Sequence, residues 1–171
     1  MYKMIIGITG HRPDKLWGYG PSASANEEKL EQYLKDTLVR YGAKEAVTGM
    51  ALGVDMIFDR AVLSLKDEGY DIKLISAVPC RNQTAKWFNQ KNIDEYNYIL
   101  SQADRVVLVS DCEYNSSVMQ IRNEWIVDNV DLLLAVWNGS NGGTGNCIRY
   151  AKAKNKAIMI IPPWIFNNDN R

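Results

Sequence analysis

Residues 119–145 read MQIRNEWIVDNVDLLLAVWNGSNGGTG: a helix-length segment, then an apolar run, then a glycine-rich loop. The apolar run, 132–137, is expected to be a strand, and the loop leads into another helical segment. A glycine-rich turn between a strand and a helix lets backbone N–H groups approach an anion, and the positive end of the helix favours phosphate there. Arg122, on the preceding helix, supplies a cation. The stretch therefore predicts one unit of an α/β sheet and a pocket for a phosphorylated small molecule.

Length and composition favour one soluble α/β domain in the cytoplasm. The 171 residues are 46% hydrophobic, which is enough material for a single core. Twenty basic residues balance twenty acidic ones, so no net charge attracts nucleic acid or a membrane surface. No apolar run reaches the roughly 18 residues of a spanning helix, and the start of the chain does not resemble a signal peptide.

The cysteine and histidine content argues against metal chemistry. Cys80, Cys112 and Cys147 are far apart and lack CxxC spacing, which is typical of reduced thiols. His11 is the sole histidine, so a histidine-based metal cluster is excluded. We expect neither a metal nor a cofactor.

Alternating strand and helix patterns predict the fold. Strands are expected at 3–9, 45–48, 73–78, 105–110, 132–137 and 157–161, and helices at 26–41, 53–66, 85–102, 116–130 and 145–154, with Asn26 capping the first helix. Continuous apolar strands separated by helices indicate a sheet that is covered on both faces. We therefore predict a three-layer, doubly wound, mostly parallel, Rossmann-like α/β fold over residues 1–165, with a flexible tail at 166–171.

Three glycine-containing turns fall at the carboxyl edge of this sheet, where such folds bind ligands. They read TGHRP at 9–13, TGMALGVD at 48–55 and GGTG at 142–145. The predicted ligand-binding residues are Gly10, His11, Arg12, Gly49, Gly53, Asp55, Arg122, Asn123, Gly142, Gly143, Thr144 and Gly145.

Several of these residues also have a plainer interpretation: Gly142 to Gly145 can be a surface turn, and Arg122 can be a solvated charge on its helix. His11 can serve only as a hydrogen-bonding turn residue, and Arg12 can simply pair with a carboxylate. Asp55 suits the first turn of a helix whether or not a ligand is present. Trp17 and Tyr19, in the loop after the first strand, could stack on a base, form a lid or pack as ordinary loop residues.

Taken together, the motifs GITGHRP, TGMALGVD, AVPC, MQIRN and GGTG resemble the SLOG superfamily, which includes YpsA-like proteins, DprA and the LOG-type enzymes. The likeness is strongest to the YpsA-like branch, which phages and prophages often encode. It covers nearly the whole chain, and it implies a Rossmann-like fold whose pocket binds nucleotides or nucleotide-derived ligands.

Comparison with the LOG-type phosphoribohydrolases separates binding from catalysis. Met119 and Arg122 match their Met-x-x-Arg-Lys helix, but Asn123 replaces the lysine. In their glycine-rich loop a glutamate is expected where Arg149 stands here, and Asn146 replaces a threonine. Glycosidic cleavage passes through an oxocarbenium-like state that a carboxylate stabilises and a guanidinium opposes. Asp55 or Asp128 could substitute for that glutamate.

Three hypotheses follow. The first is a domain that senses or sequesters a nucleotide or an NAD-derived metabolite such as ADP-ribose. The second is a nucleotide N-glycosidase in which Asp55 or His11 performs acid–base catalysis. The third, a DprA-like single-stranded DNA binder, is disfavoured by the balanced charge. Membrane association is not expected, and the resemblance leaves a homodimer open.

Overall fold

Six strands form one fully parallel sheet in the computed structural model, which describes residues 2–167. Their order is β4-β3-β2-β1-β5-β6. The strands are β1 (Met4–Gly10), β2 (Ala43–Thr48), β3 (Lys73–Val78), β4 (Arg105–Leu108), β5 (Leu132–Val136) and β6 (Ala157–Ile161). The predicted Rossmann-like α/β fold is confirmed, and the sheet is parallel throughout rather than mostly so.

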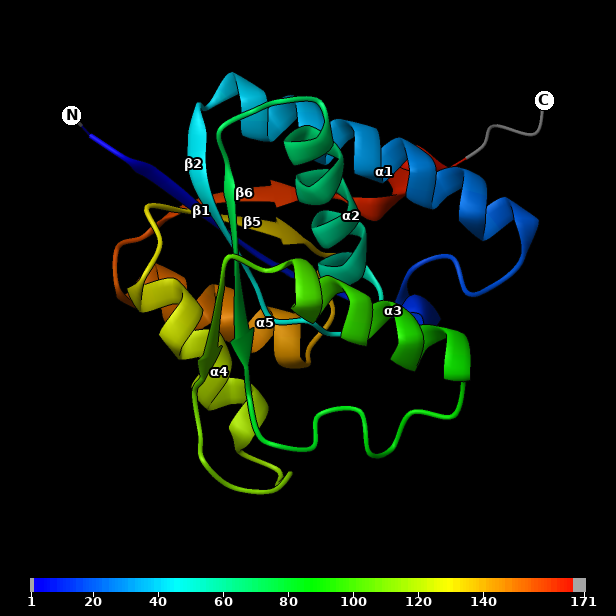
Figure 1. Ribbon diagram of the computed structural model, residues 1–171, viewed down its shortest axis with the longest axis vertical. Coiled ribbons are helices and arrows are strands. Elements are labelled where there is room, and N and C mark those ends of the chain that lie inside the picture. Colours follow the sequence, from blue (N-terminus) through cyan, green and yellow to red (C-terminus); the bar gives the residue numbers. More distant parts are fainter. Residues whose placement is uncertain (1, 168–171) are drawn as a thin grey trace.

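Helices cover both faces of the sheet and complete the three layers. They are α1 (Pro21–Arg40), α2 (Val54–Asp67), α3 (Gln90–Gln102), α4 (Val118–Asp128) and α5 (Gly143–Ala153), with short 3-10 helices η1 (Pro13–Lys15) and η2 (Pro163–Phe166). In Figure 1, α1, α2 and α3 lie on one side of the sheet and α4 and α5 on the other. Over residues 2–167, no helix is both long and apolar enough to cross a membrane.

The interior strand β5 is buried on both faces of the sheet, which explains why its sequence is apolar without a break. Leu133 packs in the hydrophobic cluster under α4 and α5, whereas Leu134 packs in the larger cluster under α1 and α2. Both side chains are fully buried, because successive residues of a strand face opposite sides of the sheet. The strand is therefore held by two cores, and neither face tolerates a polar side chain.

The predicted boundaries of β3 and β6 agree with the structure, but the start of the first helix is wrong. It begins five residues earlier than predicted, at Pro21, which occupies the first helical position after Gly20. Proline suits that position because its missing N–H needs no partner there. Asn26 therefore does not cap the helix. It lies within α1, and its side chain is buried in the protein.

A second boundary was also misplaced, because the helix predicted at 85–102 begins only at Gln90. The Asn89 side chain accepts a hydrogen bond from the Lys91 N–H, at 2.9 Å, and caps the helix at this point. The residues before it form turns, and within them the Gln83 amide is buried and donates to the Gly49 carbonyl.

The end of the described chain is packed, whereas the prediction assigned it to a flexible tail. Phe166 is buried and makes edge-on ring contacts with Trp17, at 6.2 Å, and Tyr33, at 5.4 Å. The indole N–H of Trp17 donates to the Asn167 side chain. Trp17 therefore packs as an ordinary loop residue and does not act as a lid or a base-stacking platform in this structure. The remainder of the predicted tail, 168–171, lies outside the described residues.

Candidate functional site

A pocket of about 240 Å³ opens at the point where the strand order reverses. The chain leaves β1 toward β2 on one side and leaves β5 toward β6 on the other, so the crevice lies between the carboxyl ends of β1 and β5. Residues from the β1–α1 segment, α2, α4 and α5 line it. Four elements distant in sequence therefore meet at the edge that the sequence predicted.

The amino end of α5 forms one wall of this pocket. The helix begins at Gly143, two residues earlier than predicted, and its N-cap Gly142 supplies no side-chain cap. The N–H groups of its first turn belong to residues 143–145. Of these residues, Gly143 and Thr144 line the pocket. Uncapped N–H groups together with the positive end of the helix dipole form a favourable place for an anion.

Two side chains of the β1–α1 segment hold the glycine-rich loop in place. The His11 Nε2 atom lies 2.9 Å from the Asn138 side-chain oxygen and 3.1 Å from the Asn138 backbone nitrogen. The Lys15 ammonium donates to the Asn141 carbonyl at 3.2 Å. Gly142 has a φ of 143°, and a Cβ there would lie 3.0 Å from the Lys15 Nζ atom. Glycine at this position lets Lys15 approach the loop closely.

His11 is therefore fixed by a neutral partner, with its ring largely buried. Burial lowers the pKa of its imidazole below the usual value, and the Asn138 hydrogen bond only partly opposes this. The ring is neutral at physiological pH. This geometry supports the hydrogen-bonding interpretation of His11, and the residue also lines the pocket.

Arg122 lies beneath the pocket and is almost completely buried. Its Nη1 donates to the Gly49 carbonyl and, at 3.5 Å, to the Ala77 carbonyl, while Nε donates to the Asn123 side chain at 3.0 Å. A Cβ on Gly49 would lie 2.4 Å from the guanidinium carbon, so only glycine leaves space for it. Desolvation lowers the pKa of Arg122, and the nearby Asp55 carboxyl acts in the opposite direction. Its printed hydrogen bonds among residues 2–167 go to neutral groups, and Asp55 is the carboxyl that opposes its charge.

Helix α2 contributes two buried carboxyls that differ in their surroundings. Asp55 lines the pocket and accepts a hydrogen bond from the Ala51 N–H at 3.1 Å. Asp59, one turn later, is fully buried, and a hydrogen bond with the Thr48 side chain favours its charged form against the effect of burial. Burial raises the pKa of both groups, for Asp59 well above its usual value. Burial therefore favours the protonated, neutral form of Asp59 in the core.

The structure brings together most of the predicted site, and it adds residues that the sequence did not single out. Of the predicted residues, the pocket is lined by Gly10, His11, Arg12, Asp55, Arg122, Asn123, Gly143 and Thr144. It is also lined by Thr9, Asp14, Lys15, Ala51 and Met119. Lys15 is the most important addition because it is a cation beside the anion-binding loop. Lys15 lies 126 residues before its partner Asn141, so no local sequence pattern predicts that the two meet.

Four predicted residues do not line the pocket, and their backbones explain why they are glycines. Gly49 lies under the Arg122 guanidinium, and Gly53 passes against the His11 carbonyl, 2.4 Å from where its Cβ would be. Gly142 precedes α5, and Gly145 packs near the Ser140 carbonyl inside its first turn. These glycines shape the site through close backbone approaches.

Two of the residues compared with the LOG pattern, Arg149 and Asp128, lie outside the pocket. Arg149 is exposed on α5 and donates to the Asn146 side chain. Asp128 is exposed at the end of α4 and accepts from the Tyr150 hydroxyl at 3.0 Å. Asp128 is thus no substitute for the missing glutamate. The carboxyls that line the pocket are those of Asp14 and Asp55.

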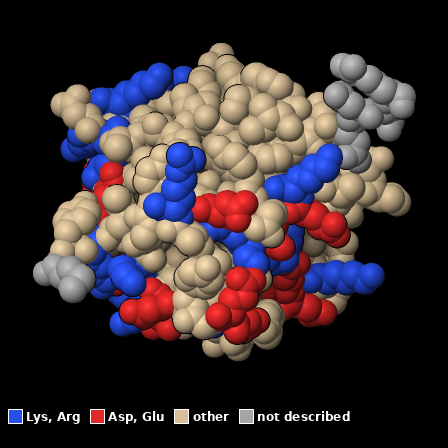
Figure 2. All heavy atoms as spheres, turned by 90° about the horizontal axis from the view of Figure 1, so that it is seen from above, with Lys and Arg blue, Asp and Glu red and all other residues tan. Residues whose placement is uncertain are grey.

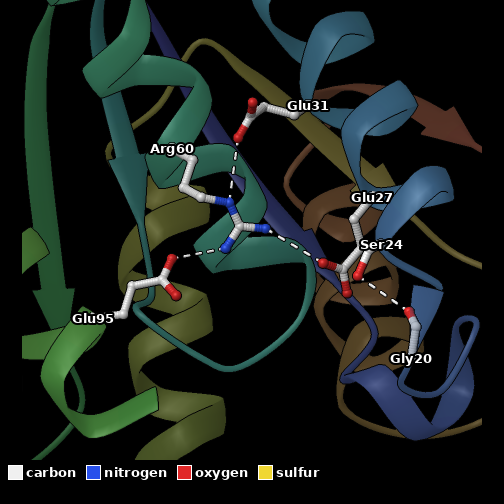
Figure 3. A network of polar contacts seen from close by, with 6 residues as sticks. All are labelled: Gly20, Ser24, Glu27, Glu31, Arg60 and Glu95. Carbon is white, nitrogen blue, oxygen red and sulfur yellow. Dashed lines mark hydrogen bonds and ion pairs between the residues drawn. The ribbon is translucent and has the colours of Figure 1, made fainter. Parts of the chain in front are cut away.

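A second hollow of about 210 Å³ lies on the other side of the segment 11–20. It surrounds Arg60, which forms ion pairs with Glu27, Glu31 and Glu95 at 3.5, 3.3 and 2.7 Å (Figure 3). Tyr19 is exposed and lines this hollow rather than the first. Three carboxylates around one guanidinium leave an excess of negative charge.

Comparison with known proteins gives the same assignment as the motifs. A family model for the YspA SLOG family matches residues 6–161. The chain is 29% identical over 143 residues to the uncharacterized SPbeta prophage-derived protein YoqJ of Bacillus subtilis (strain 168), covering 77% of this chain and 83% of YoqJ. It is 27% identical over 158 residues to a UPF0398 protein of Bacillus thuringiensis (strain Al Hakam), covering 90% of this chain and 85% of the relative.

Solved structures of DNA processing protein A share the fold. The Helicobacter pylori protein, whose structure concerns single-stranded DNA binding, aligns with a TM-score of 0.65 and 20% identity over 93% of this chain. The Streptococcus pneumoniae protein aligns with a TM-score of 0.63 and 17% identity over 94%. Our chain spans only 65% and 50% of those two chains, respectively. The match of the family model over nearly the whole sequence shows that the chain belongs to the YspA SLOG family.

Proposed function

We propose that this protein binds a phosphorylated, nucleotide-derived small molecule in the pocket between β1 and β5, as a sensing or sequestering domain. The observation that carries the proposal is the uncapped amino end of α5, which adjoins a pocket that also contains Arg12, Lys15 and Arg122. Three cations face two carboxyls there, and burial raises the pKa of one carboxyl, Asp55. The site therefore has an excess of positive charge that suits a phosphate.

The size of the pocket narrows the class of ligand. About 240 Å³ is at the small end of ligand sites, which usually enclose roughly 300–1,000 Å³. The enclosed part of the ligand is then the phosphate with its sugar, and a larger group extends toward solvent. Asp55 and Asn123 can accept hydrogen bonds from sugar hydroxyls below the phosphate. A mononucleotide, or one half of an ADP-ribose-like molecule, fits this description.

A panel of ligands tests the proposal. Thermal shift and calorimetry should show stabilisation by nucleoside monophosphates or ADP-ribose, and none by the matching nucleosides that lack phosphate. Arg122→Ala should abolish that stabilisation. The proposal fails if no phosphorylated ligand stabilises the protein, or if nucleosides bind as well as their phosphates.

An enzymatic role is the alternative, and Asp55 is the observation that favours it. Its carboxyl is buried in the pocket, close enough to Arg122 for their charges to interact, and its pKa is raised, as is common for catalytic acids. The corresponding reaction is cleavage of a nucleotide N-glycosidic bond. Incubation with nucleoside monophosphates and NAD, followed by chromatography for the free base, separates cleavage from binding. Turnover that is lost in Asp55→Asn would establish the enzyme.

Binding of single-stranded DNA is the second alternative, and the fold it shares with DNA processing protein A favours it. The charge distribution does not. Figure 2 shows Lys and Arg interleaved with Asp and Glu on the face it presents, and the formal net charge of the chain is zero. DNA binders usually present a continuous basic surface. Gel shifts at low and high salt decide the matter, because tight binding that salt weakens would favour DNA over a small ligand.

A further inference from the structure

We propose that the edge strand β4 is an interface through which two copies of this chain pair antiparallel, joining their sheets into one. This inference does not depend on the ligand of the pocket. It starts from β4 being the last strand on its side of the sheet, next to β3 alone. An unpaired strand edge is a ready template for another strand, and proteins usually protect it.

The side chains of β4 are unusually apolar for an uncovered edge. Val106 is 50% exposed and Leu108 is 43% exposed, and both lie on the α3 side of the sheet. On the other side, Val107 and Val109 are only partly buried against the cluster that also contains Trp125 of α4. Both faces of this edge therefore present hydrophobic surface, which a partner that continues the sheet would cover.

The opposite edge strand, β6, is also apolar, with Ile160 43% exposed, but the residues that flank it differ from those that flank β4. Lys152, Lys154 and Lys156 precede the strand, and Pro162 and Pro163 follow it. Lysine and proline at a strand edge discourage further pairing. The segment 104–111, which contains β4, reads DRVVLVSD and has neither lysine nor proline. The contrast between the edges points to β4 as the one that takes a partner.

The charges that flank β4 identify that partner as a second copy. Arg105 begins the strand and Asp111 follows its end. In an antiparallel pair related by a twofold axis, Arg105 of each copy comes near Asp111 of the other, so two opposite-charge contacts form at once. Asp111 also contacts Arg81, but that ion pair is highly exposed and leaves the carboxylate accessible. A parallel arrangement would instead bring like charges together.

Oligomeric state, measured by sedimentation velocity and light scattering over a range of concentrations, tests the interface. We expect a species of twice the 19.4 kDa mass of the chain. Leu108→Lys should raise its dissociation constant by roughly tenfold or more, because each dimer loses two buried leucines. Val39→Lys is the matched control, since Val39 is equally exposed, at 42%, but lies on α1; this variant should dimerise normally.

Charge-reversal variants and amide hydrogen exchange provide tests that do not depend on how Leu108→Lys folds. Arg105→Glu and Asp111→Arg should each weaken the dimer, and the double variant should restore it. Backbone amides in 105–110 of the unmodified protein should become more protected as its concentration rises. A protein that stays monomeric, or a dimer that Ile160→Lys on β6 disrupts while Leu108→Lys and the charge changes do not, would overturn the proposal.

Discussion

Two hollows of similar volume flank the segment 11–20, and each contains an arginine, yet their electrostatics are opposite. In the pocket between β1 and β5, Arg122 is buried and bonded to backbone carbonyls and an amide, and the opposing charge beside it is the Asp55 carboxyl, whose pKa burial raises. In the second hollow, Arg60 is surrounded by three glutamates that more than neutralise it (Figure 3).

The difference shows that a cavity of the right size with an arginine does not suffice for an anion site. What matters is whether the cation retains unpaired charge and whether dipoles reinforce it. Only the first pocket adjoins the amino end of α5, with Lys15 beside it. The Arg60 cluster ties α2 to α1 and α3 and is accounted for as a structural network.

The sharpest test of this comparison is to remove each arginine in turn. Arg122→Met should weaken the binding of a phosphorylated ligand by about a hundredfold, the usual size of a lost charge-assisted hydrogen bond. Arg60→Met is the matched control and should leave affinity unchanged while lowering the melting temperature. Calorimetry of both variants provides the measurement. Equal losses of affinity would show that the two hollows do not differ as described.

A smaller effect is expected from Gly49→Ala, which moves Arg122 without removing it. The new Cβ would lie 2.4 Å from the guanidinium carbon, so the side chain must shift. We expect about a tenfold loss of affinity and a lower melting temperature, as is typical of overpacking. Gly143→Ala is the control for stability, because nothing lies within 4 Å of its Cβ position. A Gly49→Ala variant as stable and as tight-binding as the unmodified protein would contradict the packing described.

Helix α2 allows a third prediction, on stability rather than affinity. Asp59 has a raised pKa in the fold, caused by burial, against an ordinary value of 3.8 when unfolded. Below that value both states hold the proton and the penalty vanishes. As pH rises above it, the unfolded chain releases the proton while the folded protein keeps it, so stability falls with rising pH.

Asp59→Asn should abolish this slope and gain stability relative to the unmodified protein, by up to about 1.4 kcal/mol for each pH unit between about pH 4.5 and neutral pH. Urea unfolding at the two pH values measures it. Asp36→Asn, on the exposed face of α1, serves as the control and should keep the original slope. An unchanged slope in Asp59→Asn would mean that this carboxyl is not held neutral.

The smallest effect concerns Lys15, whose exposed ammonium touches the loop before α5. Lys15→Gln should reduce affinity for a phosphorylated ligand about threefold at low salt, because exposed charges contribute little and are screened. The difference should shrink as salt is added. Lys44→Gln, on an exposed part of β2, should have no effect in the same titration. A Lys15 effect that salt leaves unchanged would mean that its role is steric.

Sequence patterns predicted most of the sheet well because strands such as LLLAV at 132–136 and AIMII at 157–161 are unbroken apolar runs. The start of α1 escaped prediction because its first turn, PSAS, has no apolar periodicity. Asn26 has a residue type common at caps, but its burial is decided by packing against other elements.

The candidate site was predictable only in the parts that follow strands. Glycine-containing turns indicated where the backbone can come close to a ligand. The alternation of strands and helices predicted that the three turns lie at the same edge of the sheet. The contacts that organise the site join residues far apart in the chain. His11 meets Asn138, and Arg122 meets Gly49, 127 and 73 residues away respectively. No local pattern encodes such pairs.

The central claim is that the first turn of α5 holds the phosphate of the ligand. It is tested most directly by following the backbone amide resonances of the protein while a nucleoside monophosphate is added, with the matching nucleoside as the control. We expect the amides of Gly143, Thr144 and Gly145 to shift with the phosphate-bearing ligand and not with the nucleoside. Shifts that are the same for both molecules, or that fall around Arg60 and leave the start of α5 unaffected, would contradict it.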